Sequence, residues 1–182
     1  MTAEAPFEVD DAIVLILGAP TSMPSLANRI EGVTRLEKLL FLFEHETDLK
    51  DLLTDELEFR AHNFGPFSSK VYQAVEVLEA AKIITDSARV SKSNEDAWEA
   101  AELIGDQPDA PYTTRDFELT ERGVRYYAAL RDQFLTPESE KELSVFKDKF
   151  GSVPLRQLIR YVYKRYPELT VNSIIREQVL GG

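Results

Sequence analysis

The feature that most constrains the fold is a Gly-Pro turn that leads directly into an amphipathic helix. Residues 64–68 read Phe-Gly-Pro-Phe-Ser and begin at Phe64. Gly65 can adopt backbone angles closed to other residues, while Pro66 fixes φ and lacks an N–H. Ser68 is then placed to N-cap a helix with apolar residues on one face, which are Val71, Ala74, Val75 and Leu78. A strand, a tight turn and a capped helix in this order are typical of the third helix of a winged helix.

A second helix is predicted upstream by an apparent capping box. Thr34 precedes Glu37 by three residues, so the Thr34 hydroxyl is expected to accept the Glu37 amide while the Glu37 side chain reaches back. The apolar residues that follow have helical spacing, and the helix is expected to end near Glu46. A first helix is predicted over 9–17 by its apolar density.

A β-hairpin is predicted after the third helix. Residues 57–62 alternate as a strand before the turn, and 83–85 begin a hairpin strand whose partner is 116–119. The segment 91–112 between these strands is rich in Ser, Asp, Glu and Pro, and is interpreted as an acidic wing insertion. Thr120 is expected to cap the next helix, with Val124, Tyr127, Ala128 and Phe134 facing inward.

Further helices are predicted from Thr136 to Phe150 and from Pro154 to before Pro167. The fold class expected is therefore mainly α with a small β-hairpin (α+β). Its core would be a winged helix-turn-helix domain over 1–135, with residues 136–182 as a C-terminal helical extension packed on it.

Composition narrows the functional classes. The chain has 182 residues, a formal net charge of −11 and no Cys, which excludes disulfides, thiolate nucleophiles and Cys-ligated metals. The acidic start is unlike a signal peptide, and the longest apolar run, 12–19, is too short to span a bilayer. A cytoplasmic protein with no membrane partner is expected.

Catalytic motifs are scarce. The two histidines, His45 and His62, lack the second histidine at i+3 or i+4 that a zinc site favours, and glycine-rich phosphate loops are absent from the sequence. We therefore expect neither an enzyme nor a metal or other cofactor.

The third helix would be the DNA-reading element of a DNA-binding winged helix. Its exposed face would offer Ser69, Lys70 and Gln73, with Gln73 as base reader and Lys70 as phosphate contact. The nearby Glu76 and Glu79 oppose this interpretation, and an ordinary solvated face is the alternative.

The last long helix carries the strongest surface feature. Arg156, Arg160 and Lys164 stand at i, i+4 and i+8 and form one basic stripe, interleaved with tyrosines that include Tyr163. The stripe could pair with acidic segments of the same chain, dock an acidic protein partner or hold nucleic acid. Arg156, Arg160, Lys164 and Tyr163 are the predicted partner-binding residues.

Several motifs resemble the YwgA-like family. Residues 32–42 are similar to its second helix, 64–68 to its Gly-Pro turn, 117–123 to the junction after the wing, and 161–167 to its C-terminal helix end. The ordered match covers most of 10–167. Related Panacea domains share the Gly-Pro turn, and some act as antitoxins or adaptors. The resemblance implies a prokaryotic winged-helix protein, often from mobile or defence-related loci, with no catalytic residues; the insertion at 91–112 and the low pI depart from the family.

The function expected is a non-enzymatic interaction or regulatory module, antitoxin-like or a defence-associated adaptor. Its protein partner would engage the last helix or a groove beside the second helix. The alternative is a sequence-specific DNA-binding transcriptional regulator, a homodimer, with Ser69, Lys70 and Gln73 at the DNA.

Overall fold

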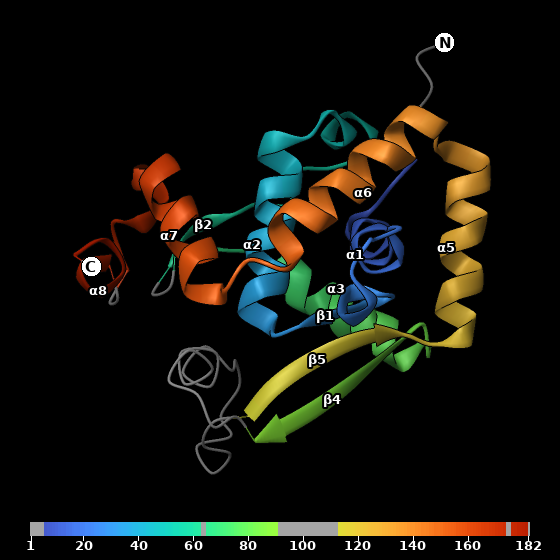
Figure 1. The fold of residues 1–182 in the computed structure, drawn as a ribbon, viewed down its shortest axis with the longest axis horizontal. Coiled ribbons are helices and arrows are strands. Elements are labelled where there is room, and N and C mark those ends of the chain that lie inside the picture. Colours follow the sequence, from blue (N-terminus) through green and yellow to red (C-terminus); the bar gives the residue numbers. More distant parts are fainter. Residues whose placement is uncertain (1–5, 63–64, 91–112, 174–175, 182) are drawn as a thin grey trace.

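The computed structural model describes residues 6–62, 65–90, 113–173 and 176–181, and shows a mainly helical protein with two small antiparallel sheets (Figure 1). The α-helices are α1 (Val9–Gly18), α2 (Val33–Glu46), α3 (Ser69–Ala80), α5 (Glu121–Phe134), α6 (Pro137–Gly151), α7 (Leu155–Arg165) and α8 (Arg176–Leu180). The strands are β1 (Arg29–Glu31), β2 (Arg60–His62), β3 (Gly65–Phe67), β4 (Ile84–Val90) and β5 (Thr113–Leu119). Short 3-10 helices are η1 (Pro24–Leu26), η2 (Asp48–Leu52) and η3 (Pro167–Thr170). Phe64 and the predicted acidic insertion at 91–112 lie outside the described residues.

The predicted hairpin is confirmed. Strands β4 and β5 are antiparallel, with Ile84 opposite Leu119. Strand β1 adds to the other side of β5, with Ile30 opposite Phe117, so the sheet order is β1-β5-β4. Strand β1 was not predicted, because three residues are too few to show an alternating pattern.

Helix α1 is the centre of the core. Residues 12–17 are fully buried on every side of the helix, as expected of a helix surrounded by other elements. Figure 1 shows α1 between α2 and α5, with α6 crossing over them, and α1 also packs on α3. Helix α7 packs on α2, and the predicted domain boundary at 135/136 stays a prediction.

The capping box predicted at Thr34 is wrong. Helix α2 begins at Val33, and its N-cap position is Gly32, with φ +92°. Thr34 is therefore inside the first turn and buried, and the Glu37 carboxylate accepts a hydrogen bond from the Ser68 amide at 3.3 Å. The chain enters α2 directly from β1, so the helix starts earlier than the capping pattern indicates.

The predicted turn at Gly65 is present, and its residues also form a short strand. Gly65 has φ +91°, and Gly65–Phe67 forms β3, which pairs with β2. Ser68 takes the predicted N-cap position of α3, but its hydroxyl donates to the Leu57 carbonyl and makes no cap hydrogen bond. From α2, the Nζ of fully buried Lys38 donates to the Pro66 carbonyl at 2.9 Å. The turn is therefore held by buried polar contacts from the core.

The cap of α5 and part of its buried face agree with the prediction. The Thr120 hydroxyl accepts a hydrogen bond from the Gly123 amide, which confirms the cap of α5, and Tyr127 is buried as expected. Val124 and Phe134 are 40% and 37% exposed, so their predicted inward placement is wrong. The buried stripe of α5 runs through Gly123, Tyr127 and Leu130 instead, although the Phe134 ring packs edge-on against buried Phe7, with centroids 5.5 Å apart.

Within the part of the chain that the structure describes, none of the helices combines the length and the apolar character needed to cross a membrane.

Candidate interaction surfaces

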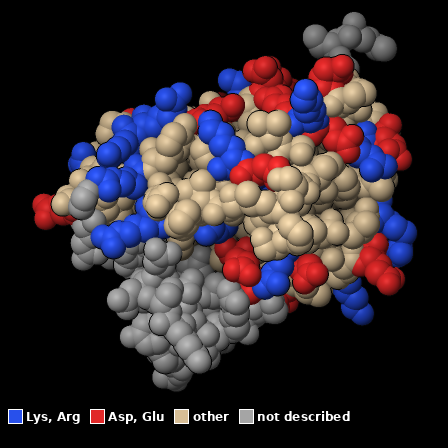
Figure 2. All heavy atoms as spheres, viewed as in Figure 1, with Lys and Arg blue, Asp and Glu red and all other residues tan. Residues whose placement is uncertain are grey.

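The predicted basic stripe lies on α7. The apolar residues Leu155, Leu158, Ile159 and Val162 are buried, so the opposite side of the helix faces outward. Arg156 and Lys164 are exposed and Arg160 is half-buried, and these three residues are called the basic face below. Figure 2 shows Lys and Arg gathered over α7, at the left end of the molecule.

The prediction that Tyr163 contacts a partner is wrong. Its side chain is fully buried, and its hydroxyl lies 2.7 Å from the Ser173 Oγ. A Cβ added to Gly65 would stand 2.6 Å from the Tyr163 ring, so the ring packs directly on the Gly-Pro turn. Tyr163 follows Ile159 by one helical turn, and that register places it in the core.

Two other tyrosines fasten α7 to the end of α2. The hydroxyl of Tyr161 donates to the Glu46 carboxylate at 2.8 Å, and that of Tyr166 donates to it at 2.9 Å. Arg165 adds an ion pair to the same carboxylate at 2.9 Å. Burial and the hydrogen bond to Glu46 raise the pKa of Tyr161 to about 12. One side of α7 is thus fixed in place, while the basic face lies beside it.

The exposed face of α3 has a different character. Ser69 and Gln73 are exposed, but Lys70 forms an ion pair with Glu58 at 2.8 Å and donates to the Glu56 carbonyl at 3.1 Å. The hydrogen bond between the two side chains raises the pKa of Lys70 and lowers that of Glu58. The Lys70 ammonium is therefore engaged with an acid of its own chain.

Acidic and apolar side chains complete the α3 face. Glu76 and Glu79 are exposed, and Val77 is 56% exposed. Carboxylates repel phosphates, so this face is poorly suited to the backbone contacts that supply most DNA affinity.

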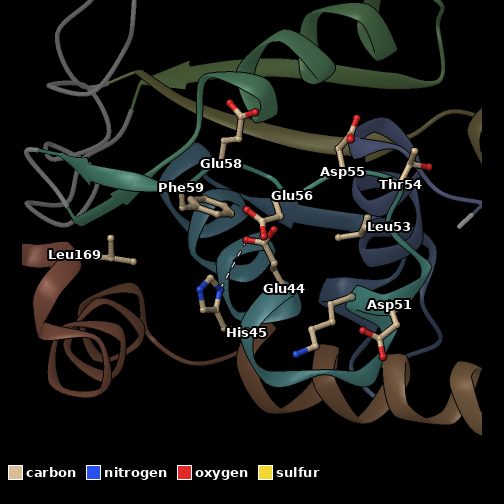
Figure 3. A pocket seen from close by; sticks show the side chains of 11 residues that line it. Glu44, His45, Asp51, Leu53, Thr54, Asp55, Glu56, Glu58, Phe59 and Leu169 are labelled. Atoms are coloured by element: carbon tan, nitrogen blue, oxygen red, sulfur yellow. Dashed lines mark ion pairs between the residues drawn. The ribbon is translucent and has the colours of Figure 1, made fainter.

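A groove of about 590 Å³ opens beside the C-terminal end of α2 (Figure 3). Its lining comes from α2, η2, the segment 53–59 and η3. The lining residues are Glu44, His45, Lys50, Asp51, Leu53, Thr54, Asp55, Glu56, Glu58, Phe59 and Leu169. Carboxylates outnumber the cations, and three apolar side chains lie among them. This groove is called the acidic groove below.

Local contacts fix the walls of the acidic groove. The Glu44 carboxylate accepts a hydrogen bond from the Leu57 amide at 2.7 Å, which holds the 53–59 segment against α2. The His45 ring stacks on Phe41 with centroids 4.1 Å apart, and its Nδ1 lies 2.9 Å from the Phe41 carbonyl. A smaller pocket of about 240 Å³ shares Thr54 and Asp55 with the groove and continues the acidic surface to Glu8 and Asp10.

The two histidines lie in different aromatic surroundings. His62, on β2, packs its ring on Phe67 of β3 with centroids 4.7 Å apart, whereas His45 stacks on Phe41. Among the described residues, no group of three or more acids and histidines could hold a metal ion.

A buried lysine on α6 went unnoticed in the sequence. Lys147 is fully buried, and its Nζ donates to the carbonyls of Leu17 and Ala19, at 2.5 and 3.2 Å, where α1 ends. Burial lowers the pKa of Lys147 to about 8. The signal was available, because Lys147 follows the buried Leu143 by one helical turn.

Searches against protein-family models and against curated proteins found no match for this chain.

Proposed function

We propose that this chain is a non-enzymatic interaction module, regulatory or antitoxin-like, that binds an acidic segment of a partner protein through the basic face of α7. The observation that carries the proposal is the contrast between two helices. The basic face stands on a well-anchored helix that has no acid between Leu155 and Arg165, whereas the exposed face of α3 carries Glu76 and Glu79 together with Lys70.

Anchoring by Glu46 supports this role. Tyr161, Tyr166 and Arg165 hold α7 against α2, so the helix need not be ordered on binding. A preorganised surface loses less conformational entropy when a partner docks. Arginine is also favoured at protein interfaces, where its guanidinium group can bind carboxylates in a bidentate way.

A winged-helix core is the scaffold that we propose for this module. Its support is the order α1-β1-α2-α3-β4-β5, with the small β2–β3 sheet inserted between α2 and α3, together with the antiparallel sheet order β1-β5-β4. The resemblance of the motifs at 32–42 and 64–68 to YwgA-like and Panacea-type proteins agrees with this proposal.

The test uses a fluorescent acidic peptide with glutamates at i, i+4 and i+8. We expect binding at physiological salt, and at least a tenfold loss for the double variant Arg156→Glu/Arg160→Glu. The matched control is Arg122→Glu/Arg125→Glu, which makes the same charge change at two exposed positions of α5. Equal losses for both double variants would mean that net charge, and not the α7 face, attracts the peptide.

The second candidate function is sequence-specific DNA binding. It is favoured by one observation, the placement of exposed Ser69 and Gln73 on a helix followed at once by the β4–β5 hairpin. Selection of the protein against a random duplex pool at physiological salt tests it. Enrichment of one motif, with relaxed preference in Gln73→Ala, would establish the DNA reader in place of the adaptor.

A further inference from the structure

The chain carries two surfaces of opposite charge that complement each other. The basic face of α7 presents Arg156, Arg160 and Lys164, while the acidic groove is lined by five carboxylates, from Glu44, Asp51, Asp55, Glu56 and Glu58. The net charge of −11 therefore conceals a local separation of charge. Local fields determine docking at short range.

The dimensions of the two surfaces are compatible. Residues four apart on a helix are separated by about 6 Å along its axis, so the basic face spans about 12 Å. The groove, at about 590 Å³, falls within the size range of ligand pockets, so it can admit the ends of long side chains but not a whole helix. Arginine and lysine side chains are long enough to insert while the α7 backbone stays outside.

The chemistry of the groove suits arginine in particular. Leu53, Phe59 and Leu169 line it together with the acids. An arginine side chain can place its aliphatic stem on apolar groups and its guanidinium plane on an aromatic ring, and it can still reach a carboxylate. The groove thus offers both kinds of contact that the basic face needs.

We propose that the acidic groove of one copy of this chain receives the basic face of a second copy, so that the protein self-associates head to tail. The contact joins two different surfaces, and it is therefore heterologous. The inference rests on the basic face assigned under the proposed function, and it adds regulation, because self-association covers the same face that a partner needs.

Salt should decide the strength of this association. The net negative charges of two copies repel each other over a longer range than the ion pairs between the basic face and the acidic groove act. At physiological ionic strength the Debye length is about 8 Å, so salt screens much of this repulsion. Exposed ion pairs weaken further as salt increases. We expect the average mass to increase with protein concentration at physiological salt, and to return to that of a monomer at high salt.

Sedimentation equilibrium with two charge-reversed variants tests the proposal. One variant is Arg156→Glu/Arg160→Glu, which reverses the basic face, and the other is Asp55→Lys/Glu56→Lys, which reverses the groove at two exposed positions. Each variant alone should be monomeric where the wild type associates. An equimolar mixture should associate again, because each variant retains the surface that the other needs.

Renewed association in the mixture would also show that both variants are folded, because an unfolded variant could not restore association. A wild type that is monomeric at every concentration, or a mixture that stays monomeric, would overturn self-association. The groove variant keeps its basic face and no longer covers it by self-association, so it should bind the acidic peptide at least as tightly as the wild type does. If peptide binding persists while association fails, the further inference is wrong and the proposed function stands; if Arg156→Glu/Arg160→Glu still binds peptide, the proposed function fails as well.

Discussion

Helices α3 and α7 both bury an apolar face, but their outer faces differ in charge and in attachment. On α3, Lys70 is paired with Glu58, and the exposed residues include Glu76 and Val77. On α7, the segment 155–165 contains cations and no acid, and its anchors are tyrosines that bind Glu46. The position of a helix in a fold therefore does not identify its ligand. The charge that the helix presents is the more informative property.

The strongest loss is expected at Gly65, in strand β3, where the Tyr163 ring of α7 packs on the turn that precedes α3. Gly65→Ala should destabilise the protein by about 3 kcal/mol, because a Cβ would strain a backbone at φ +91° and collide with the Tyr163 ring. Chemical denaturation measures the loss. The variant Gly151→Ala is the control, since its nearest new contact is a flexible leucine side chain at 3.0 Å. A similar loss in both variants would contradict the backbone strain and the Tyr163 collision assigned to Gly65.

The charge contrast should appear as a difference in peptide affinity. Reversal of Arg156 and Arg160 should weaken binding of the acidic peptide at least tenfold, or about 1.4 kcal/mol. Lys70→Glu on α3 should change it less than twofold, because Lys70 already interacts with Glu58. Fluorescence anisotropy measures both. If Lys70→Glu has the larger effect, the two helices have been assigned the wrong roles.

Because Lys147 is buried, the free energy of unfolding should depend on pH in a way that exposed cations do not cause. Its pKa is lowered by burial from 10.5 to about 8, so between these values the unfolded chain binds more protons than the folded one. The free energy of unfolding should therefore rise with pH across this window.

Lys147→Met removes the titrating group while keeping an unbranched side chain. The wild type should gain stability relative to Lys147→Met as the pH rises from about 8 to 10.5, whatever their difference at neutral pH. The tyrosines with raised pKa values titrate in both proteins, so they cancel in the comparison. Parallel stability curves for the two proteins would contradict the effect assigned to Lys147.

The smallest expected effect is at Gln73. Gln73→Ala should leave stability and acidic-peptide binding unchanged, because Gln73 is exposed on α3 and far along the chain from the basic face. Thermal melting and anisotropy are the measurements. A clear loss of peptide binding would bring α3 into the interface.

Local patterns predicted much of the fold, and tertiary contacts account for the errors. Thr120 caps α5 as its sequence indicates, whereas Thr34 in a similar pattern lies inside α2, because Gly32 carries the chain from β1 into the helix. The register of α7 was sufficient to place Tyr163 in the core and Tyr161 at its edge. Ten of the eleven residues that line the acidic groove lie within 44–59, so its acidic character was visible in the sequence. The hydrogen bond that holds this stretch against α2 and the approach of Leu169 depend on tertiary contacts that no local pattern shows.

One titration compares a peptide ligand and a DNA ligand on the basic face of α7. The acidic peptide and a duplex DNA of similar charge are each added to the wild type and to Arg156→Glu/Arg160→Glu at physiological salt. We expect the wild type to bind the peptide more tightly than the DNA, and the double variant to lose peptide binding. Peptide binding that survives the reversal, or a preference for DNA that Gln73→Ala abolishes, would contradict it.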